Sequence, residues 1–349
     1  MTTNSSNGTI SEFLLNAGTE YFVIDVSRTR QIMDNQEFFE CELNQQPFPR
    51  PRQGHAWLCV VFWNKQLNHE HYIWFIKLPV DEQSLLMPAA RDQFLHIVVQ
   101  ALGREMEQMQ NQQGELPENP FVFAPSQQLL ADCNATIRKH LGVANRPELK
   151  KAIDYLKAPS VQAWDNLAVQ DISDVAVNVD DPQIRHAIEQ NLEVLPHAVN
   201  TCLLSGLEST QLEDSTIDAI LSYHSRCEQT LAPMLLRALG NTQTAQVQQY
   251  IHQLIQSEQS LDVETLVVIA GRHWHALIPD VSGNQQALAQ YFEKLVQADA
   301  SYALFRGIFA DLVQIPQLRV FVLATLRAPK QSEDVSKAIA SLFEQQAKP

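Results

Sequence analysis

HAWLCVVFWNKQLNHEHYIWFIKLPV, residues 55–80, is the stretch that decides the fold of the N-terminal part of the chain. It contains two apolar runs rich in aromatic and β-branched residues, beginning at His55 and Tyr72, and each predicts a β-strand. Residues 64–70 join the runs as a polar loop, which indicates an antiparallel hairpin. Because nearly every position in both runs is apolar, we expect both faces of both strands to be covered.

The sequence before and after this hairpin adds another strand and several helices. Residues 21–26, YFVIDV, predict a strand, and residues 11–16 and 35–42 are typical of short helices. A longer helix begins near Pro88, because proline suits the first helical position. Together these segments predict a small α+β domain with an antiparallel hairpin over residues 1–104.

A change of composition separates this domain from the rest of the chain. Residues 105–128 are rich in Gln, Asn, Glu and Pro, which predicts a linker. Beyond it, apolar residues recur at helical spacing, as at Ile217, Ile220 and Leu221. The breaks between these segments are short, so neighbouring helices should be antiparallel. Residues 129–349 are therefore predicted to form an all-α domain.

The predicted helices recur in pairs. Apolar runs beginning near Leu195, Leu231, Leu266 and Leu304 are separated by 36, 35 and 38 residues. This period is typical of helix-pair solenoids, such as HEAT-like arrays. Because no consensus residue recurs, a HEAT-like solenoid and an irregular helical bundle both remain open. In the solenoid, a helix over residues 333–346 would cap the array.

Composition and charge limit the classes of function. The chain has 349 residues, of which 45% are hydrophobic, enough for a sizeable core in two domains. Its formal net charge of −15 makes nucleic acid and anionic membranes unlikely partners. No secretory signal is recognisable, and no apolar run reaches the ~18 residues of a spanning helix. The five cysteines include no C-x-x-C pair, which indicates reduced thiols and a cytoplasmic protein.

Motifs for catalysis and cofactor binding are sparse. The sequence contains no G-x-S-x-G, Walker A, G-x-G-x-x-G or H-E-x-x-H motif, so we expect no cofactor and favour binding over catalysis. Asp81, Glu82, Arg91 and Asp92 follow a predicted buried strand and could act as an acid–base or metal-binding group. The alternative is a salt-bridged junction between strand and helix.

Two pairs of histidines have H-x-H spacing. His69 and His71 fall in the predicted hairpin loop, where two imidazoles can face one side, but no third metal ligand is near them. His273 and His275 fall in a helical run, where positions i and i+2 point apart. We therefore expect neither pair to bind a metal.

Acidic residues are concentrated where the helical domain begins. Between residues 158 and 225 the chain has eleven acids and one base, Arg185. The acids are Asp165, Asp171, Asp174, Asp180, Asp181, Glu189, Glu193, Glu208, Glu213, Asp214 and Asp218. They could dock a protein with a basic surface, or they could form a solvated face that keeps the protein soluble. We favour a protein-interaction or scaffolding function, with an enzyme site in the N-terminal domain as the alternative.

The N-terminal part also resembles a known family. HAWLCVVFWN and YIWFIKLPVDEQSLLMPAARDQFL, together with GTEYFVIDVSRTRQIM from Gly18 and PFPRPRQ from Pro47, are similar to an uncharacterised family of proteobacterial proteins of about this length. The resemblance implies a bacterial, non-secreted protein that is one unit from end to end. It implies no activity, cofactor or catalytic residue, so no role is carried to any position.

Overall fold

The computed structural model describes residues 8–64, 70–107, 118–159, 161, 163–279, 286–328 and 331–344. These residues divide into two compact units. The N-terminal unit comprises residues 1–125 together with Gln314–Pro316, and the helical unit comprises the remainder. The first mixes strands and helices and the second is helical, which confirms the predicted α+β part followed by an α part.

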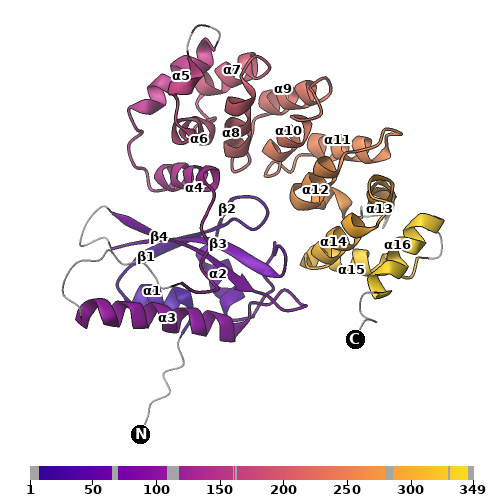
Figure 1. Ribbon diagram of the computed structural model, residues 1–349. Helices are drawn as coiled ribbons and strands as arrows, with labels where there is room; N and C mark the ends of the chain where they lie inside the picture. The colour runs from indigo at the N-terminus through magenta and orange to yellow at the C-terminus, as the bar shows by residue number, and fades with distance from the viewer. Residues whose placement is uncertain are drawn as a thin grey trace. The chain divides into compact units, whose positions relative to one another are not determined.

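In the described part of the N-terminal unit, four strands form an antiparallel sheet with the order β2-β1-β3-β4 (Figure 1). The strands are β1 (Glu20–Asp25), β2 (Gln31–Met33), β3 (His55–Trp63) and β4 (His71–Pro79). β3 and β4 form the predicted hairpin, with Cys59 opposite Phe75. The sequence did not predict β2, because three residues with two apolar side chains carry no strand pattern.

The described part of this unit has three helices, and two of them begin at a capping side chain. They are α1 (Ile10–Asn16), α2 (Asn35–Glu42) and α3 (Pro88–Glu107). At α1, the backbone N–H of Glu12 donates to Thr9 Oγ1 at 3.0 Å, and the Glu12 carboxylate accepts from the Thr9 N–H at 2.8 Å. This reciprocal capping box satisfies donors that a helix start leaves free. At α2, the Asp34 carboxylate accepts the backbone N–H groups of Gln36 and Glu37 at 2.8 and 3.2 Å.

α1, α2 and α3 pack against one face of the sheet and enclose an apolar core there (Figure 1). The core joins Leu14 of α1, Phe38 of α2 and Phe94 of α3 to Leu58 and Ile76 of the sheet, and all five are buried. Burying side chains of this size stabilises the fold by about 1.5–3 kcal/mol each.

Burial differs between the two strands of the hairpin. In β3, Leu58 and Val60 are fully buried on one face and Cys59 and Val61 are fully buried on the other. In β4, Tyr72 is 55% exposed. The expectation of two covered faces is therefore confirmed for β3 but wrong for the beginning of β4, where Tyr72 lines an open cavity.

The predicted linker, residues 105–128, is partly structured. α3 continues to Glu107, and the centre of the segment lies outside the described residues. Near its end, the Lys77 N–H donates to the Phe121 carbonyl at 2.7 Å, and the Phe123 N–H donates to the Phe75 carbonyl at 3.1 Å. The segment thus hydrogen-bonds to the free edge of β4 before the helical unit begins.

The helical unit is a succession of short helices. They are α4 (Gln127–His140), α5 (Glu148–Lys157), α6 (Val169–Val177), α7 (Pro182–Asn191), α8 (His197–Leu207), α9 (Asp214–His224), α10 (Ala232–Ala238), α11 (Ala245–Gln256), α12 (Val263–Arg272), α13 (Gln286–Ala298), α14 (Ala303–Leu312), α15 (Pro316–Thr325) and α16 (Glu333–Glu344). Two 3₁₀ turns, η1 (Trp164–Asn166) and η2 (Trp274–Leu277), lie between them.

These helices pack in two rows (Figure 1). In the first row, α4, α6, α8, α10, α12 and α14 each contact the next. In the second row, α5 contacts α7, α7 contacts α9, and α11 contacts α13. Side chains connect α9 to α11, since Gln246 donates to Asp218 at 2.5 Å and His224 bonds to Tyr250 at 2.8 Å. Each helix therefore contacts mainly its neighbours within and across the rows.

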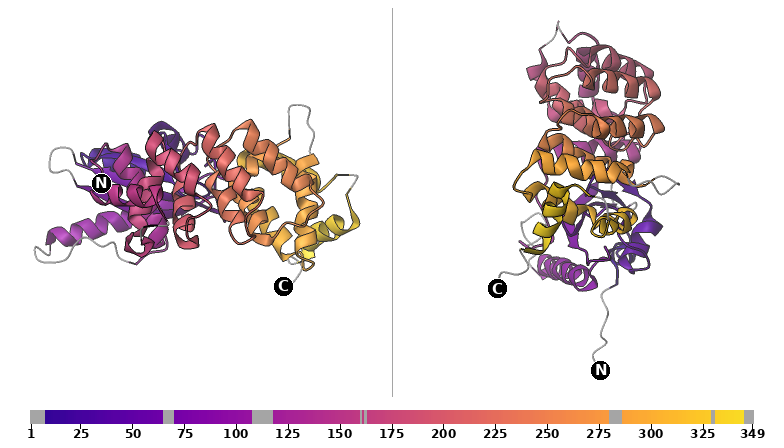
Figure 2. Two further views of the ribbon diagram at one scale, coloured as in Figure 1. Left: turned by 90° about the horizontal axis from the view of Figure 1, so that it is seen from above. Right: turned by 90° about the vertical axis from the view of Figure 1, so that its right-hand side faces the viewer.

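The periodic apolar runs coincide with one row. The runs near Leu195, Leu231, Leu266 and Leu304 fall at or within α8, α10, α12 and α14, which are consecutive members of the first row. The predicted last helix is α16, which packs on α13 and α14 and is drawn in yellow in Figure 2.

Two further features concern the chain as a whole. All five cysteines carry free thiols, and Cys41, Cys59 and Cys133 are buried. Among the described residues, no helix combines the length and the apolar character needed to cross a bilayer.

Candidate functional site

The acidic pair Asp81 and Glu82 lies in the turn that follows β4. The Asp81 carboxylate accepts the backbone N–H groups of Gln83 and Leu85 at 2.8 and 2.9 Å. It therefore holds a tight turn, as a short acidic side chain commonly does. Glu82 is exposed to solvent.

The other two N-terminal candidates, Arg91 and Asp92, lie near the start of α3. Arg91 forms an ion pair with Asp92 at 2.8 Å and donates to the Glu42 carbonyl at 2.6 Å. The guanidinium thus ties α3 to the end of α2. The structure gives these groups contacts typical of a strand-to-helix junction, and neither they nor Asp81 and Glu82 line the cavities described below.

The histidine pairs are placed differently from one another. His71 begins β4, and His69 lies outside the described residues. His273 is buried at the end of α12, where its Nε2–H donates to the Leu236 carbonyl at 2.8 Å. His275 stacks on Trp274 in η2. Among the described residues, no three His, Cys, Asp or Glu side chains are grouped so that they could hold a metal ion.

Asp171 and Asp174, two of the eleven predicted acids, are buried inside the helical unit. Both lie on α6 and accept from Arg146 Nη1, at 3.2 and 3.3 Å. Burial raises the pKa of Asp174, while hydrogen bonds from Gln170 and the charge of Arg146 act in the opposite direction. These carboxylates fasten the segment before α5 to α6.

Glu208, a third predicted acid, is 1% exposed at the end of α8. Its two carboxylate oxygens each accept from an arginine Nε at 2.7 Å, one from Arg237 of α10 and the other from Arg272 of α12. One carboxylate thereby joins three consecutive helices of the first row. The paired geometry is what allows a charge to be buried there.

Asp132 of α4 is a buried acid that the sequence did not single out. It accepts from Ser173 of α6 at 2.6 Å, from Ser205 of α8 at 3.0 Å and from Gln128 at 2.9 Å. Next to it, α8 comes so close to α6 that a Cβ on Gly206 would lie 2.4 Å from the Ala176 Cβ. The sequence carried no clear signal for this acid, because the residues one helical turn away, Gln128 and Thr136, are polar too.

The remaining predicted acids are accessible, and several gather on α7 and α9. Glu189 of α7 accepts the hydroxyl protons of Ser215 and Thr216 at 2.7 Å, which places its carboxylate against the first turn of α9. Glu213, Asp214 and Asp218 are exposed on that same helix or at its start. We call the set Glu189, Glu213, Asp214 and Asp218 the acidic face. In the described part of the chain, none of the four takes part in an ion pair.

The other exposed acids are not part of this set. Asp165, Asp180, Asp181 and Glu193 lie in the connections that precede or follow α6 and α7. Asp180 pairs with Lys139 at 2.6 Å, and this hydrogen bond lowers the pKa of Asp180. Glu193 pairs with Arg226.

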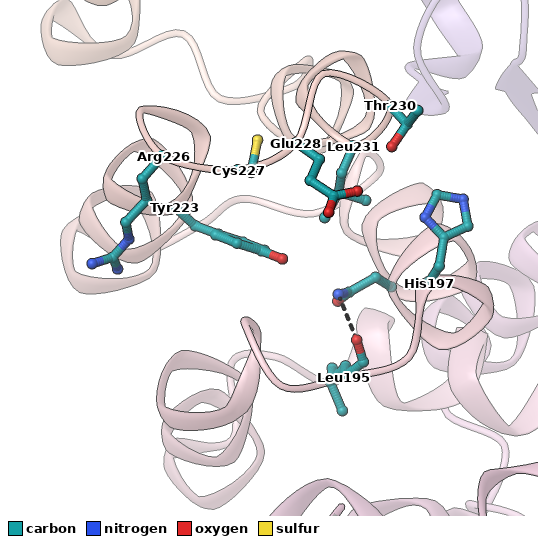
Figure 3. Close-up of a pocket in the computed structure, with 9 residues that line it drawn as sticks. Leu195, His197, Tyr223, Arg226, Cys227, Glu228, Thr230 and Leu231 are labelled. Carbon is teal, nitrogen blue, oxygen red and sulfur yellow. Dashed lines mark hydrogen bonds between the residues drawn. The ribbon is translucent and has the colours of Figure 1, made fainter.

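A cavity of about 270 Å³ opens between the beginning of α8 and the connection from α9 to α10 (Figure 3). It is lined by Leu195, His197, Asn200, Tyr223, Arg226, Cys227, Glu228, Thr230 and Leu231. Burial raises the pKa values of Tyr223 and Cys227, so both are protonated at neutral pH. Cys227 is therefore not an activated thiolate.

Asn200, one of the lining residues, has a buried amide side chain with an unsatisfied oxygen. The side chain is 1% exposed, and its amide donates to the carbonyls of Leu192 and Leu195 at 3.0 and 3.2 Å. Both amide hydrogens are thus used, which fixes the orientation of the group. The Oδ1 atom is buried and accepts no hydrogen bond from any described residue. An acceptor left in this state costs about 1–3 kcal/mol.

A second cavity, of about 800 Å³, lies in the N-terminal unit and is mainly apolar. Phe62, Tyr72, Trp74 and Phe123 contribute rings to its wall. Phe62 and Trp74 also pack against the core of that unit, so the aromatic strands serve the fold first.

Comparisons with known proteins place the chain in a family but assign it no activity. The family described as "Protein of unknown function (DUF3549)" matches residues 6–343. No curated protein and no solved structure matches the chain. The resemblance to an uncharacterised family is thereby confirmed, while the bacterial origin remains a prediction.

Proposed function

We propose from the geometry that this chain, which belongs to the family of unknown function named above, is a protein-docking scaffold. In this proposal the helical unit is a helix-pair solenoid, and the acidic face on α7 and α9 binds a basic segment of another protein.

The order of helix contacts supports the solenoid. Each helix of the first row contacts the next member of that row. Between the rows, α5 contacts α6, α9 contacts α10, and α12 contacts α13. In solenoids each repeat contacts only its neighbours, and the stacked units leave an extended surface free for partners. This link from architecture to protein binding is an analogy at the level of the fold.

The observation that carries the docking proposal is the contact of Glu189 with the start of α9. The hydroxyls of Ser215 and Thr216 hold the Glu189 carboxylate there at 2.7 Å, next in sequence to Glu213 and Asp214. Like charges are thus gathered by two neighbouring helices with no ion-pair partner from the described residues. If these acids served only to keep the protein soluble, they would not need to lie close together.

The charge of this face suits a basic partner. Exposed ion pairs contribute only about 0–1 kcal/mol each, so the four carboxylates would act mainly on the association rate and the choice of partner. The net charge of −15 adds a long-range attraction for a cationic surface, and salt would screen it. The free thiols support a reducing compartment, which we take to be the cytoplasm.

No specific observation favours the enzyme alternative. Asp81 and Arg91 are engaged in contacts that hold a turn and a helix junction.

Affinity purification from the native host tests this function. The wild-type chain should retain a stoichiometric partner with a Lys/Arg-rich segment, and high salt should release it. The variant E213Q/D214N/D218N should lose that partner. The control E118Q/E258Q/E264Q removes the same number of charges from exposed positions elsewhere and should retain it. Equal retention by both variants, or a partner indifferent to salt, would overturn the proposal.

A further inference from the structure

The cavity between α8 and the α9–α10 connection has a chemistry distinct from that of the acidic face. Its wall includes Glu228 with its carboxylate, Tyr223 with its phenol, and Asn200, whose amide oxygen is buried. Figure 3 shows the carboxylate of Glu228 and the hydroxyl of Tyr223 pointing into the space that these residues surround. All three groups offer oxygen acceptors.

The acceptor on Asn200 is the clearest sign of a ligand. Its Oδ1 is buried, its orientation is fixed by two bonds from the amide nitrogen, and it has no donor among the described residues. Buried acceptors are normally satisfied. A ligand that brings an N–H donor would satisfy this one.

The charges around the cavity select the kind of donor. Glu228 forms no ion pair within the described residues, so its carboxylate is available to a cation. Arg226 is the cation on the wall, but it is paired with Glu193 and extends away from the other side chains in Figure 3. His197 and Cys227 complete the wall without a second carboxylate. An anion would meet Glu228, and a metal ion would find one carboxylate ligand.

An ammonium group matches these features. It has three N–H donors and no acceptor, so it can donate to more than one of the oxygens that Glu228, Tyr223 and Asn200 offer. The ring of Tyr223 also offers a face to a cation. A volume of about 270 Å³ suits one aliphatic amine and is below the usual size of drug-like pockets.

We propose that this cavity binds a primary ammonium group on an alkyl chain. The group can come from a lysine side chain of another protein or from a small free amine. The inference is independent of the acidic face, because none of the four residues of that face lines the cavity.

Calorimetric titration of the full chain tests the proposal with three probes. 1,5-Diaminopentane represents a free amine, N-acetyl-lysine methylamide represents a lysine side chain, and 1-pentanol is an uncharged control. We expect at least one amine to bind and pentanol not to bind. Tighter binding of the lysine derivative indicates a protein source, and tighter binding of the diamine indicates a small molecule.

Variants separate this site from general charge attraction. E228Q should weaken binding of the amine by roughly twofold to fivefold, because it removes the negative charge of an exposed ion pair with the ammonium group. E258Q removes an exposed carboxylate outside the cavity and should bind as the wild type does. E213Q/D214N/D218N should also bind as the wild type, even if it loses its protein partner. Equal affinities of E228Q and E258Q, equal binding of pentanol, or no binding of either amine would overturn the proposal.

Discussion

The two rows of the helical unit use the same residue types in opposite ways. In the first row, Asp174 and Glu208 are buried and paired with arginines. In the second row, Asp214 and Asp218 face solvent, and Glu189 is held by hydroxyl groups. The first-row carboxylates are thus buried and paired with arginines, whereas the second-row carboxylates are accessible and have no ion-pair partner among the described residues. The four predictions below test this division, from the largest expected effect to the smallest.

Removing the carboxylate that joins three first-row helices should have the largest effect. Glu208→Ala leaves Arg237 and Arg272 facing each other without their shared anion. We expect the free energy of unfolding to fall by about 3–5 kcal/mol, measured by urea denaturation followed by helical circular dichroism. Glu213→Ala, at the exposed start of α9, is the matched change and should stay within about 0.5 kcal/mol. Similar losses in the two variants would contradict the division.

Acid should destabilise the first row through His273. Burial, partly opposed by the hydrogen bond to Leu236, lowers its pKa from 6.5 to about 4. As the pH falls below 6.5, His273 becomes protonated in the unfolded chain but stays neutral in the folded chain. The free energy of unfolding therefore decreases progressively down to about pH 4. At about pH 4.5 this amounts to about 2.5 kcal/mol.

His273→Gln isolates that contribution, because its amide can still donate to Leu236 but does not titrate. Urea denaturation of both proteins at about pH 7 and about pH 4.5 gives the comparison. The variant should lose less stability on acidification than the wild type does. If the two losses are equal, His273 is not the source.

Two helical glycines report how tightly the first row packs. In Gly206→Ala the new Cβ would lie 2.4 Å from the Ala176 Cβ, so α6 and α8 must separate, at a cost of about 1–3 kcal/mol. Gly271→Ala in α12 meets no atom within 4 Å and should stabilise by up to about 1 kcal/mol. Thermal or urea denaturation should show opposite signs. Two shifts of the same sign would argue against close contact between α6 and α8.

Neutralising the second row should have the smallest effect on stability. The triple variant E213Q/D214N/D218N removes exposed carboxylates that have no ion pair among the described residues. We expect a change in unfolding free energy within about 0.5 kcal/mol by urea denaturation. A loss comparable to that of Glu208→Ala would mean that these acids also hold the fold together.

Local patterns in the sequence predicted the elements well. Apolar runs and the proline at the start of α3 predicted β1, β3, β4 and the helices of the N-terminal unit, because those signals act over a few residues. The period of the apolar runs marked α8, α10, α12 and α14. β2 was missed because a short strand is defined by its partner β1 rather than by its own residues.

Local patterns could not predict which acids are buried in ion pairs and which are accessible to solvent. Glu208 meets Arg272 across 64 residues of sequence, and only the packing of α8, α10 and α12 brings them together. Counting charges over residues 158–225 therefore mixed buried ion-pair partners with accessible carboxylates. The ammonium-type cavity was missed for the same reason, since Asn200 and Glu228 come from separate segments.

The most direct test of the docking account is the salt dependence of binding to the purified partner. The dissociation constant would be measured over a series of salt concentrations for the wild type, for E213Q/D214N/D218N and for E118Q/E258Q/E264Q. The account predicts that affinity falls with salt for the wild type and the control, and that the acidic-face variant binds weakly with a much shallower dependence. Parallel salt dependences and equal affinities for all three proteins would contradict it.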